Sequence, residues 1–146
     1  MITIEELKKK QSETTRLIGL DLGSKRIGVS ICDEKQSIAT PLKTLNKTNA
    51  ENLINELKII IEENNIKGII IGYPINMDGT LGRSAQSVND VSNNIDKALD
   101  IDVCLWDERL STVGAFNLSS QLDINVSKRE KKIDQNAAAF ILQGAI

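Results

Sequence analysis

The sequence predicts a single α/β domain built on a mixed sheet of about five strands flanked by helices. Three strand-like segments come first, and helical and strand-like segments alternate after them. This order, β-β-β-α-β-α-β-α-α, is typical of an antiparallel meander extended by parallel strands through helical crossovers. A length of 146 residues suits one core and is too short for two. We therefore expect one domain over residues 16–146, preceded by a polar N-terminal extension over residues 1–15.

The first three predicted strands are short and separated by turn residues. Residues 17–23 form an apolar run that ends in a turn at glycine. Residues 26–33 alternate between apolar and polar side chains, and the segment at 33–36 suits a hairpin loop. A third strand is expected at residues 39–45. These segments would form the antiparallel part of the sheet.

The central part of the chain changes between two hydrophobic periods. From Asn49 onwards, apolar residues recur every three or four positions, as in a helix that packs on one face. Residues 68–73 form a continuous run of glycine, isoleucine and tyrosine, which is typical of a strand buried on both faces of a parallel sheet. Residues 101–106 are expected to form another buried strand. Residues 84–99, between these runs, are again helical in period. The pattern predicts two strands joined by a helical crossover.

The last third of the chain is predicted to be mostly helical. Ser111 or Thr112 can cap a helix that carries the apolar residues between 113 and 122. Residues 123–132 are polar and basic and are expected to form a loop. A final helix should begin at about Ile133 and run to the end of the chain.

Composition excludes several kinds of chemistry. The chain has no histidine, which excludes histidine bases, serine–histidine nucleophiles and imidazole-bound zinc. Cys32 and Cys104 lie in apolar segments without metal-binding spacing, so we expect reduced core thiols. The net charge is −2, so binding to nucleic acid would depend on local basic patches. With neither a secretory signal nor a run long enough to span a bilayer, we expect a cytoplasmic protein without membrane partners.

Acidic residues occur where predicted strands end and where the last helix begins. Asp21 is near the end of the first strand, Asp107 and Glu108 follow the strand that ends at Trp106, and Asp134 shares a helical face with small alanines. Ligands bind beyond the carboxyl ends of strands in open α/β sheets. Carboxylates that gather there without histidine favour Mg²⁺ or Mn²⁺, and two such ions can cleave a phosphodiester bond.

Each of these acids also has a structural interpretation. Asp21 can satisfy the turn that follows its strand, and Glu108 can pair with Arg109. Asp134 can cap the last helix or complement its dipole. No single acid therefore identifies a metal site, and these alternatives stay open at this stage.

Four ordered motifs are more specific than any one acid. They are residues 20–30 (LDLGSKRIGVS), 71–79 (IGYPINMDG), 106–112 (WDERLST) and 134–143 (DQNAAAFILQ). Together they resemble the YqgF/RuvX family over nearly all of residues 17–146. The resemblance implies a ribonuclease H-like fold related to the RuvC resolvases. It also implies a nuclease that matures the 5′ end of pre-16S rRNA; earlier descriptions of the family propose Holliday-junction resolution instead.

The resemblance also implies a site and its ligands. Asp21, Glu108 and Asp134 would hold two Mg²⁺ or Mn²⁺ ions and be the catalytic residues, with Asp107 as the alternative to Glu108. Successive strand residues point to opposite faces, so only one of the two neighbouring acids should face the metals, and we favour Glu108. The expected substrate-binding residues are Lys25, Arg26, Asn76, Arg109, Lys128 and Arg129.

The expected partner is nucleic acid, either structured RNA or DNA junctions, and a homodimer would supply a second basic surface. Two other classes of protein compete with this interpretation. The Asp-x-Gly-Ser motif at residues 21–24 is shared with actin-like and sugar-kinase ATPases, but those enzymes need two such domains. A non-catalytic, RNA-binding ribosome assembly factor is the other, although an aromatic content of 3% disfavours recognition by base stacking.

Overall fold

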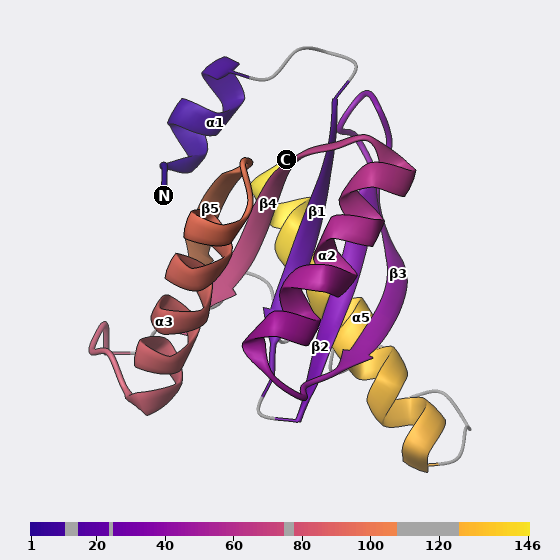
Figure 1. Cartoon of the computed structure of the whole chain (residues 1–146), viewed down its shortest axis with the longest axis vertical. Helices are drawn as coiled ribbons and strands as arrows, with labels where there is room; N and C mark the ends of the chain where they lie inside the picture. The colour runs from indigo at the N-terminus through magenta and orange to yellow at the C-terminus, as the bar shows by residue number, and fades with distance from the viewer. Residues whose placement is uncertain (11–14, 24, 75–77, 108–125) are drawn as a thin grey trace.

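The computed structural model is a five-stranded mixed sheet with helices on both faces (Figure 1). The strand order is β3-β2-β1-β4-β5, which places the first strand of the chain at the centre. The structure describes residues 1–10, 15–23, 25–74, 78–107 and 126–146, except for the side chains of residues 126–135. The predicted fold class is confirmed.

The three N-terminal strands form the predicted meander. They are β1 (Arg16–Leu22), β2 (Arg26–Cys32) and β3 (Ala39–Asn46). β1 pairs with β2 in antiparallel register, and β2 pairs with β3 in the same way. The turn after β1 is tight, because the Gly23 amide donates to the Arg26 carbonyl at 3.0 Å. A Cβ atom at Gly23 would lie 2.6 Å from that same oxygen, so only glycine fits this turn.

Two parallel strands extend the sheet on the other side of β1. β4 (Ile66–Tyr73) pairs with β1, and β5 (Asp102–Asp107) pairs with β4. Since β1, β4 and β5 are parallel, their carboxyl ends reach the same edge of the sheet. This is the edge at which the sequence predicts the functional site.

Two helices cover one face of the sheet. They are α2 (Ala50–Asn64) and α3 (Arg83–Ala98), which lie in front of the strands in Figure 1. The Asn49 side chain caps α2 by accepting from the Asn52 amide at 2.8 Å, and Asn65 ends the helix in a left-handed conformation with φ 53°. The larger core lies beneath these helices and is built mainly from the aliphatic residues of β1, β2, β4 and β5.

The opposite face is covered by α5 (Val126–Ala145), the last helix of the chain. The predicted start of this helix, at about Ile133, is wrong, because it begins about two turns earlier. Residues 128–132, expected in a loop, belong to its first turns. Lysine, arginine and glutamate are good helix formers, so this charged segment continues the helix even though it has no apolar stripe of its own. The helix predicted between residues 113 and 122 lies outside the described residues.

The N-terminal extension packs against the sheet through α1 (Ile4–Lys10). Leu7 is fully buried, and Ile2 forms a parallel bridge with Cys104 of β5. The N-terminal amine contacts Asp96 at 3.1 Å, and Lys10 contacts Asp102 at the same distance. Among the helices of the described residues, none is both long and apolar enough to cross a membrane.

Candidate metal centre

Asp21 lies near the carboxyl end of the central strand, on the face that α5 covers. Its neighbours Leu20 and Leu22 point into the core beneath α2 and α3, so strand alternation turns Asp21 to the other face. On one side, Asp21 pairs with Gly28 of β2. On the other side, the last pair between β1 and β4 is Leu20 with Ile71, so Gly72 of β4 is the next residue beside Asp21. The half-buried carboxylate thus has a glycine on each side, and neither neighbour fills the adjacent space with a side chain.

The final helix crosses β1 close to Asp21 and runs antiparallel to it. A Cβ atom at Gly19 would lie 2.8 Å from the Ala138 carbonyl oxygen and 2.8 Å from Cβ of Leu142. Asp21 is two residues beyond Gly19, about 7 Å along the strand. Position 134 is four residues before Ala138, about 6 Å along the helix. Measured from the contact between Gly19 and Ala138, the backbones of residues 21 and 134 therefore lie at similar distances toward the carboxyl edge of the sheet.

Asp134 has a different place in its helix from the one that the sequence suggests. It lies in the third turn of α5, so it is neither the cap nor a first-turn residue. Capping, which is the common structural explanation for such an acid, does not apply here. The side chain of Asp134 lies outside the described residues.

The last residue of β5, Asp107, can be assigned to one face of the sheet. Asp107 is the partner of Tyr73 in β4, and Tyr73 packs against the core beneath α2 and α3. Trp106, in contrast, packs in the second core, on the face of Asp21. Asp107 is therefore on the face away from Asp21. Glu108 lies outside the described residues.

The predicted substrate-binding residues are placed in part. Lys25 is exposed in the turn after β1, and Arg26 begins β2 on the same face as Asp21. The backbone of Lys128 and Arg129 lies in the first turn of α5. Asn76 and Arg109 lie outside the described residues. The structure thus brings Arg26 and the backbone of α5 to the side of Asp21.

The donor chemistry suits a hard divalent cation. Carboxylate oxygens are the preferred protein ligands of Mg²⁺, and the two glycines beside Asp21 in the sheet add no side chain next to its carboxylate. Within the described part of the chain, no group of three or more acidic, cysteine or histidine side chains could hold a metal. Two of the three predicted ligands, the side chains of Glu108 and Asp134, lie beyond that part.

Two residues that position the candidate site were missed by the sequence analysis. Gly19 permits the close approach of α5, and Ser30 of β2 donates to the Ala138 carbonyl oxygen at 2.7 Å. Ser30 is fully buried, and its polar side chain interrupts an otherwise apolar strand. The sequence signal for Ser30 was its polar side chain within an apolar strand, at a position that strand alternation places on the face of Asp21.

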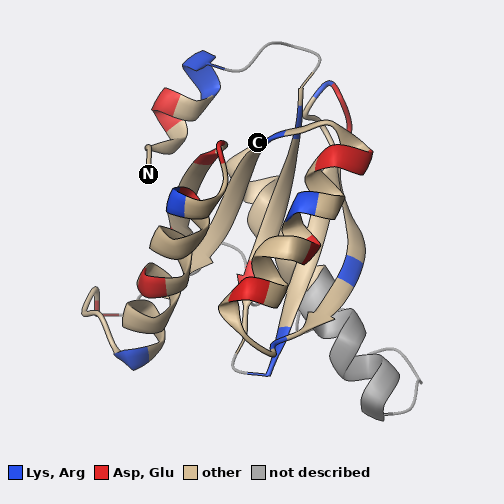
Figure 2. Cartoon of the chain, viewed as in Figure 1, with Lys and Arg blue, Asp and Glu red and all other residues tan. Residues whose placement is uncertain are grey.

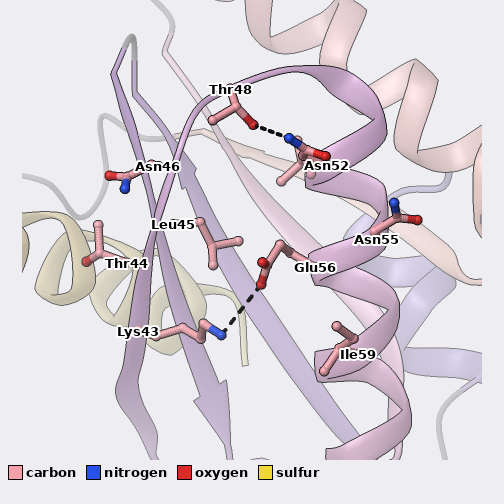
Figure 3. Close-up of a pocket in the computed structure, with 10 residues that line it drawn as sticks. Lys43, Thr44, Leu45, Asn46, Thr48, Asn52, Asn55, Glu56 and Ile59 are labelled. Atoms are coloured by element: carbon pink, nitrogen blue, oxygen red, sulfur yellow. Dashed lines mark hydrogen bonds and ion pairs between the residues drawn. The ribbon is translucent and has the colours of Figure 1, made fainter.

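A sizeable cavity on the described part of the chain is not lined by these acids. It has a volume of about 550 Å³ and lies between β3 and α2, on the opposite face of the sheet from Asp21 (Figure 3). Lys43 and Glu56 form an ion pair across it at 3.7 Å. Glu56 is the one acid among the described residues that line this cavity, so it does not offer the clustered carboxylates expected of a metal centre.

Both cysteines are free and buried, as predicted. Burial raises the pKa of the Cys104 thiol to about 11, with a further contribution from Glu5 and Glu6. Burial also raises the pKa of Cys32, although the Leu17 amide hydrogen bond opposes the change. Neither thiol has the depressed pKa that nucleophilic catalysis requires.

Comparison with known proteins identifies the chain's relatives. A Pelagibacter ubique protein named "Putative pre-16S rRNA nuclease" is 76% identical over 146 residues, which cover 100% of this chain and 97% of that protein. A relative of the same name from Chelativorans is 42% identical, covering 100% of this chain and 91% of its own length. Both alignments include the N-terminal extension.

A solved structure supports the fold independently. Thermus thermophilus RuvC, in complex with a Holliday junction substrate, matches with a TM-score of 0.57 and 11% sequence identity. The match covers 87% of this chain and 91% of that one, so the common fold extends over nearly the whole domain. The family model described as "RuvX: Holliday junction resolvase" matches residues 15–146, and the chain belongs to this family.

Proposed function

We propose that this chain is a metal-dependent nuclease that hydrolyses phosphodiester bonds in the 5′ precursor segment of 16S rRNA. One observation carries the proposal: Asp21 lies between two glycines at the carboxyl edge, under the helix whose third turn holds Asp134. The names of the close relatives and of the family model agree on nucleic-acid cleavage. Catalysis without histidine fits this proposal, because two-metal hydrolysis needs no imidazole base.

In this proposal, Asp21, Glu108 and Asp134 bind two Mg²⁺ or Mn²⁺ ions. When bound, the ions would polarise the phosphodiester and lower the pKa of the attacking water. Asp21 provides a ligand on a rigid central strand, which keeps its position fixed during catalysis. Arg26, on the same face, would bind a phosphate oxygen and orient the scissile bond. The protein remains in the cytoplasm, where its precursor RNA is made.

Cleavage of labelled RNA tests the catalytic part. Wild-type protein with Mn²⁺ or Mg²⁺ should cut a precursor 16S fragment, and EDTA should abolish cutting. Asp21→Asn, Glu108→Gln and Asp134→Asn should each reduce the rate by about 100-fold or more, the scale of losing a group that stabilises the transition state. Asp107→Asn is the matched control, because position 107 belongs to the opposite face. Equal loss in this control, or equal cutting by all variants, would refute the assigned site.

Metal binding can be measured separately from turnover. A ligand that binds only the folded state raises its melting temperature. Mn²⁺ should therefore stabilise wild type and Asp107→Asn but should have much less effect on Asp21→Asn. Stabilisation that is identical in all three would place the bound ion elsewhere.

The family description suggests DNA junctions as the other substrate. A four-way DNA junction should therefore be compared with the RNA fragment at equal concentration and salt, since nucleic-acid affinity depends strongly on salt. Preferential cutting of RNA would support rRNA processing, whereas symmetrical cutting of the junction alone would replace it with resolution. If metal binds but neither substrate is cut, the non-catalytic assembly factor becomes the better interpretation.

A further inference from the structure

A second, smaller pocket lies at the same edge of the sheet as Asp21, on the side covered by α3. Its volume is about 280 Å³. Gly23, Lys47, Arg83, Ser84 and Ser87 contribute to its lining, and apolar residues of β1 and α3 complete it. It is distinct from the larger cavity between β3 and α2, whose lining includes none of these residues.

The pocket concentrates positive charge that no acid of the described residues neutralises. Lys47 follows β3, and Arg83 is the first residue of α3, so the two cations come from different elements. Neither forms a salt bridge with any residue that the structure describes, and none of the described lining residues is acidic. Lys43 and Lys10, in contrast, contact carboxylates. In Figure 2, basic residues colour the first turn of α3 and the turn after β1 at the lower edge of the molecule.

Neutral donors accompany these cations. The hydroxyl groups of Ser84 and Ser87 can donate to an anionic oxygen. The N-terminus of α3 adds a weaker positive field, because the first amide groups of a helix have no partners within it. Gly82, the N-cap residue, makes no side-chain hydrogen bond to these amides. The pocket therefore offers a lysine, an arginine and two hydroxyl groups, and these groups suit the charged oxygens of a phosphate better than they suit an uncharged ligand.

The pocket is connected to the candidate metal centre through the turn after β1. Gly23 lines the pocket and is two residues beyond Asp21, so about 7 Å of chain separates them. The Lys47 amide donates to the Lys25 carbonyl at 3.0 Å, which ties the Lys47 segment to the same turn. A nucleic-acid strand that crosses this edge of the sheet would therefore pass from the pocket on the α3 face, over the turn, to Asp21 on the α5 face.

We propose that the pocket between Lys47 and Arg83 binds a backbone phosphate of single-stranded RNA, next to the scissile phosphate at Asp21. This inference rests on the proposed nuclease function and extends it by assigning the path of the substrate. The two side chains are binding residues and take no part in the chemical step.

The test compares two double variants that change net charge equally. Lys47→Gln/Arg83→Gln removes both cations of the pocket. Lys35→Gln/Lys97→Gln is the matched control, because Lys35 precedes β3 and Lys97 lies in the last turn of α3, at the other ends of the same elements. Binding of a fluorescent single-stranded RNA is measured in EDTA by anisotropy over a series of salt concentrations, and cleavage is measured with Mn²⁺.

The pocket variant should bind about tenfold more weakly, as expected when charge-assisted hydrogen bonds to a phosphate are removed. The slope of its salt dependence should fall by about 0.7 for each phosphate of the single strand that it no longer neutralises. KM for cleavage should rise by a similar factor while kcat stays near the wild-type value. Lys47→Arg/Arg83→Lys, which keeps both charges, should recover most of the affinity.

Equal weakening in the control variant would overturn the inference, because the effect would then reflect net charge alone. Wild-type affinity and salt slope in the pocket variant would overturn it as well. Failure of the nuclease proposal gives a different result, since the wild-type protein itself would not cut RNA. A fall in kcat without a change in affinity would also contradict a pure binding role.

Discussion

Gly19→Ala should disturb stability and activity together, because this glycine lets the last helix lie directly on the central strand. An added Cβ would lie 2.6 Å from Oγ of Ser30, 2.8 Å from the Ala138 carbonyl and 2.8 Å from Cβ of Leu142. Ordinary contacts between carbon atoms are about 3.5–4.0 Å, so α5 must move outward by about 1 Å. Overpacking of this kind costs about 1–3 kcal/mol of folding free energy.

The same shift should affect catalysis through the backbone position of Asp134. That residue lies one turn before Ala138, so an outward movement of α5 carries it away from Asp21. A displacement of about 1 Å in a reacting arrangement can reduce the rate by about 100-fold. Urea denaturation and RNA cleavage with Mn²⁺ measure the two effects separately.

Gly144→Ala is the matched control on the same helix. Its added Cβ would lie 3.3 Å from Nε1 of Trp106, which requires only a few tenths of an ångström of adjustment. We expect a change of less than about 1 kcal/mol, because alanine also favours the helix. Wild-type stability in Gly19→Ala would refute the close packing of α5. Reduced stability with unchanged kcat would refute the coupling of this helix to the site.

Three further predictions concern regions away from the site. Leu7→Ala should cost about 3 kcal/mol in urea denaturation, because Leu7 is fully buried where α1 packs; an unchanged midpoint would show that α1 is dispensable. Hydrogen bonds from the Ile38 amide and from Ser37 lower the pKa of Asp33 to about 2, so its stabilisation is present above about pH 4 and is lost toward pH 2. Asp33→Asn should flatten the acid limb of the pH–stability curve, and an identical limb would contradict this. Maleimide should label Cys104 only after unfolding, since burial raises its pKa, and rapid labelling of the native protein would count against the buried position.

The strands were predictable because their hydrophobic periods are strong and local. The continuous run at residues 68–73 marked β4, and alternation at residues 26–33 marked β2. Parallel pairing of β1, β4 and β5 then followed from chain order and crossover rules. Hydrophobic period depends on neighbours in sequence, and the crossover rules need only the order of the elements, so one sequence was enough to predict these features.

The packing of α5 could not be derived in the same way. Its charged first turns have no apolar stripe, so periodicity placed its start at about Ile133 instead of Val126. The roles of Gly19 and Ser30 depend on a contact with Ala138, which is more than 100 residues away from Ser30. Docking of α1 depends similarly on β5, so a weak helical face looked like an unattached extension.

The site's dependence on helix register leads to a last prediction. One turn separates Asp134 from Ala138, and Ala138 is fixed against β1 by its contact with Gly19 and against β2 by its hydrogen bond from Ser30. One alanine inserted after Asn136 would rotate the preceding helix by about 100°, which turns position 134 away from the face of Asp21. One alanine inserted after Lys131 leaves the spacing from 134 to 138 intact and serves as the control.

The two insertions therefore separate register from helix length. The first should abolish RNA cleavage and weaken stabilisation by Mn²⁺, while thermal unfolding still shows a cooperative transition. The second should keep both metal binding and cleavage, because it moves only the turns before Asp134. Full cleavage by the first variant would mean that Asp134 does not act from this face of α5, and the acid on that helix would then have to be removed from the proposed metal centre.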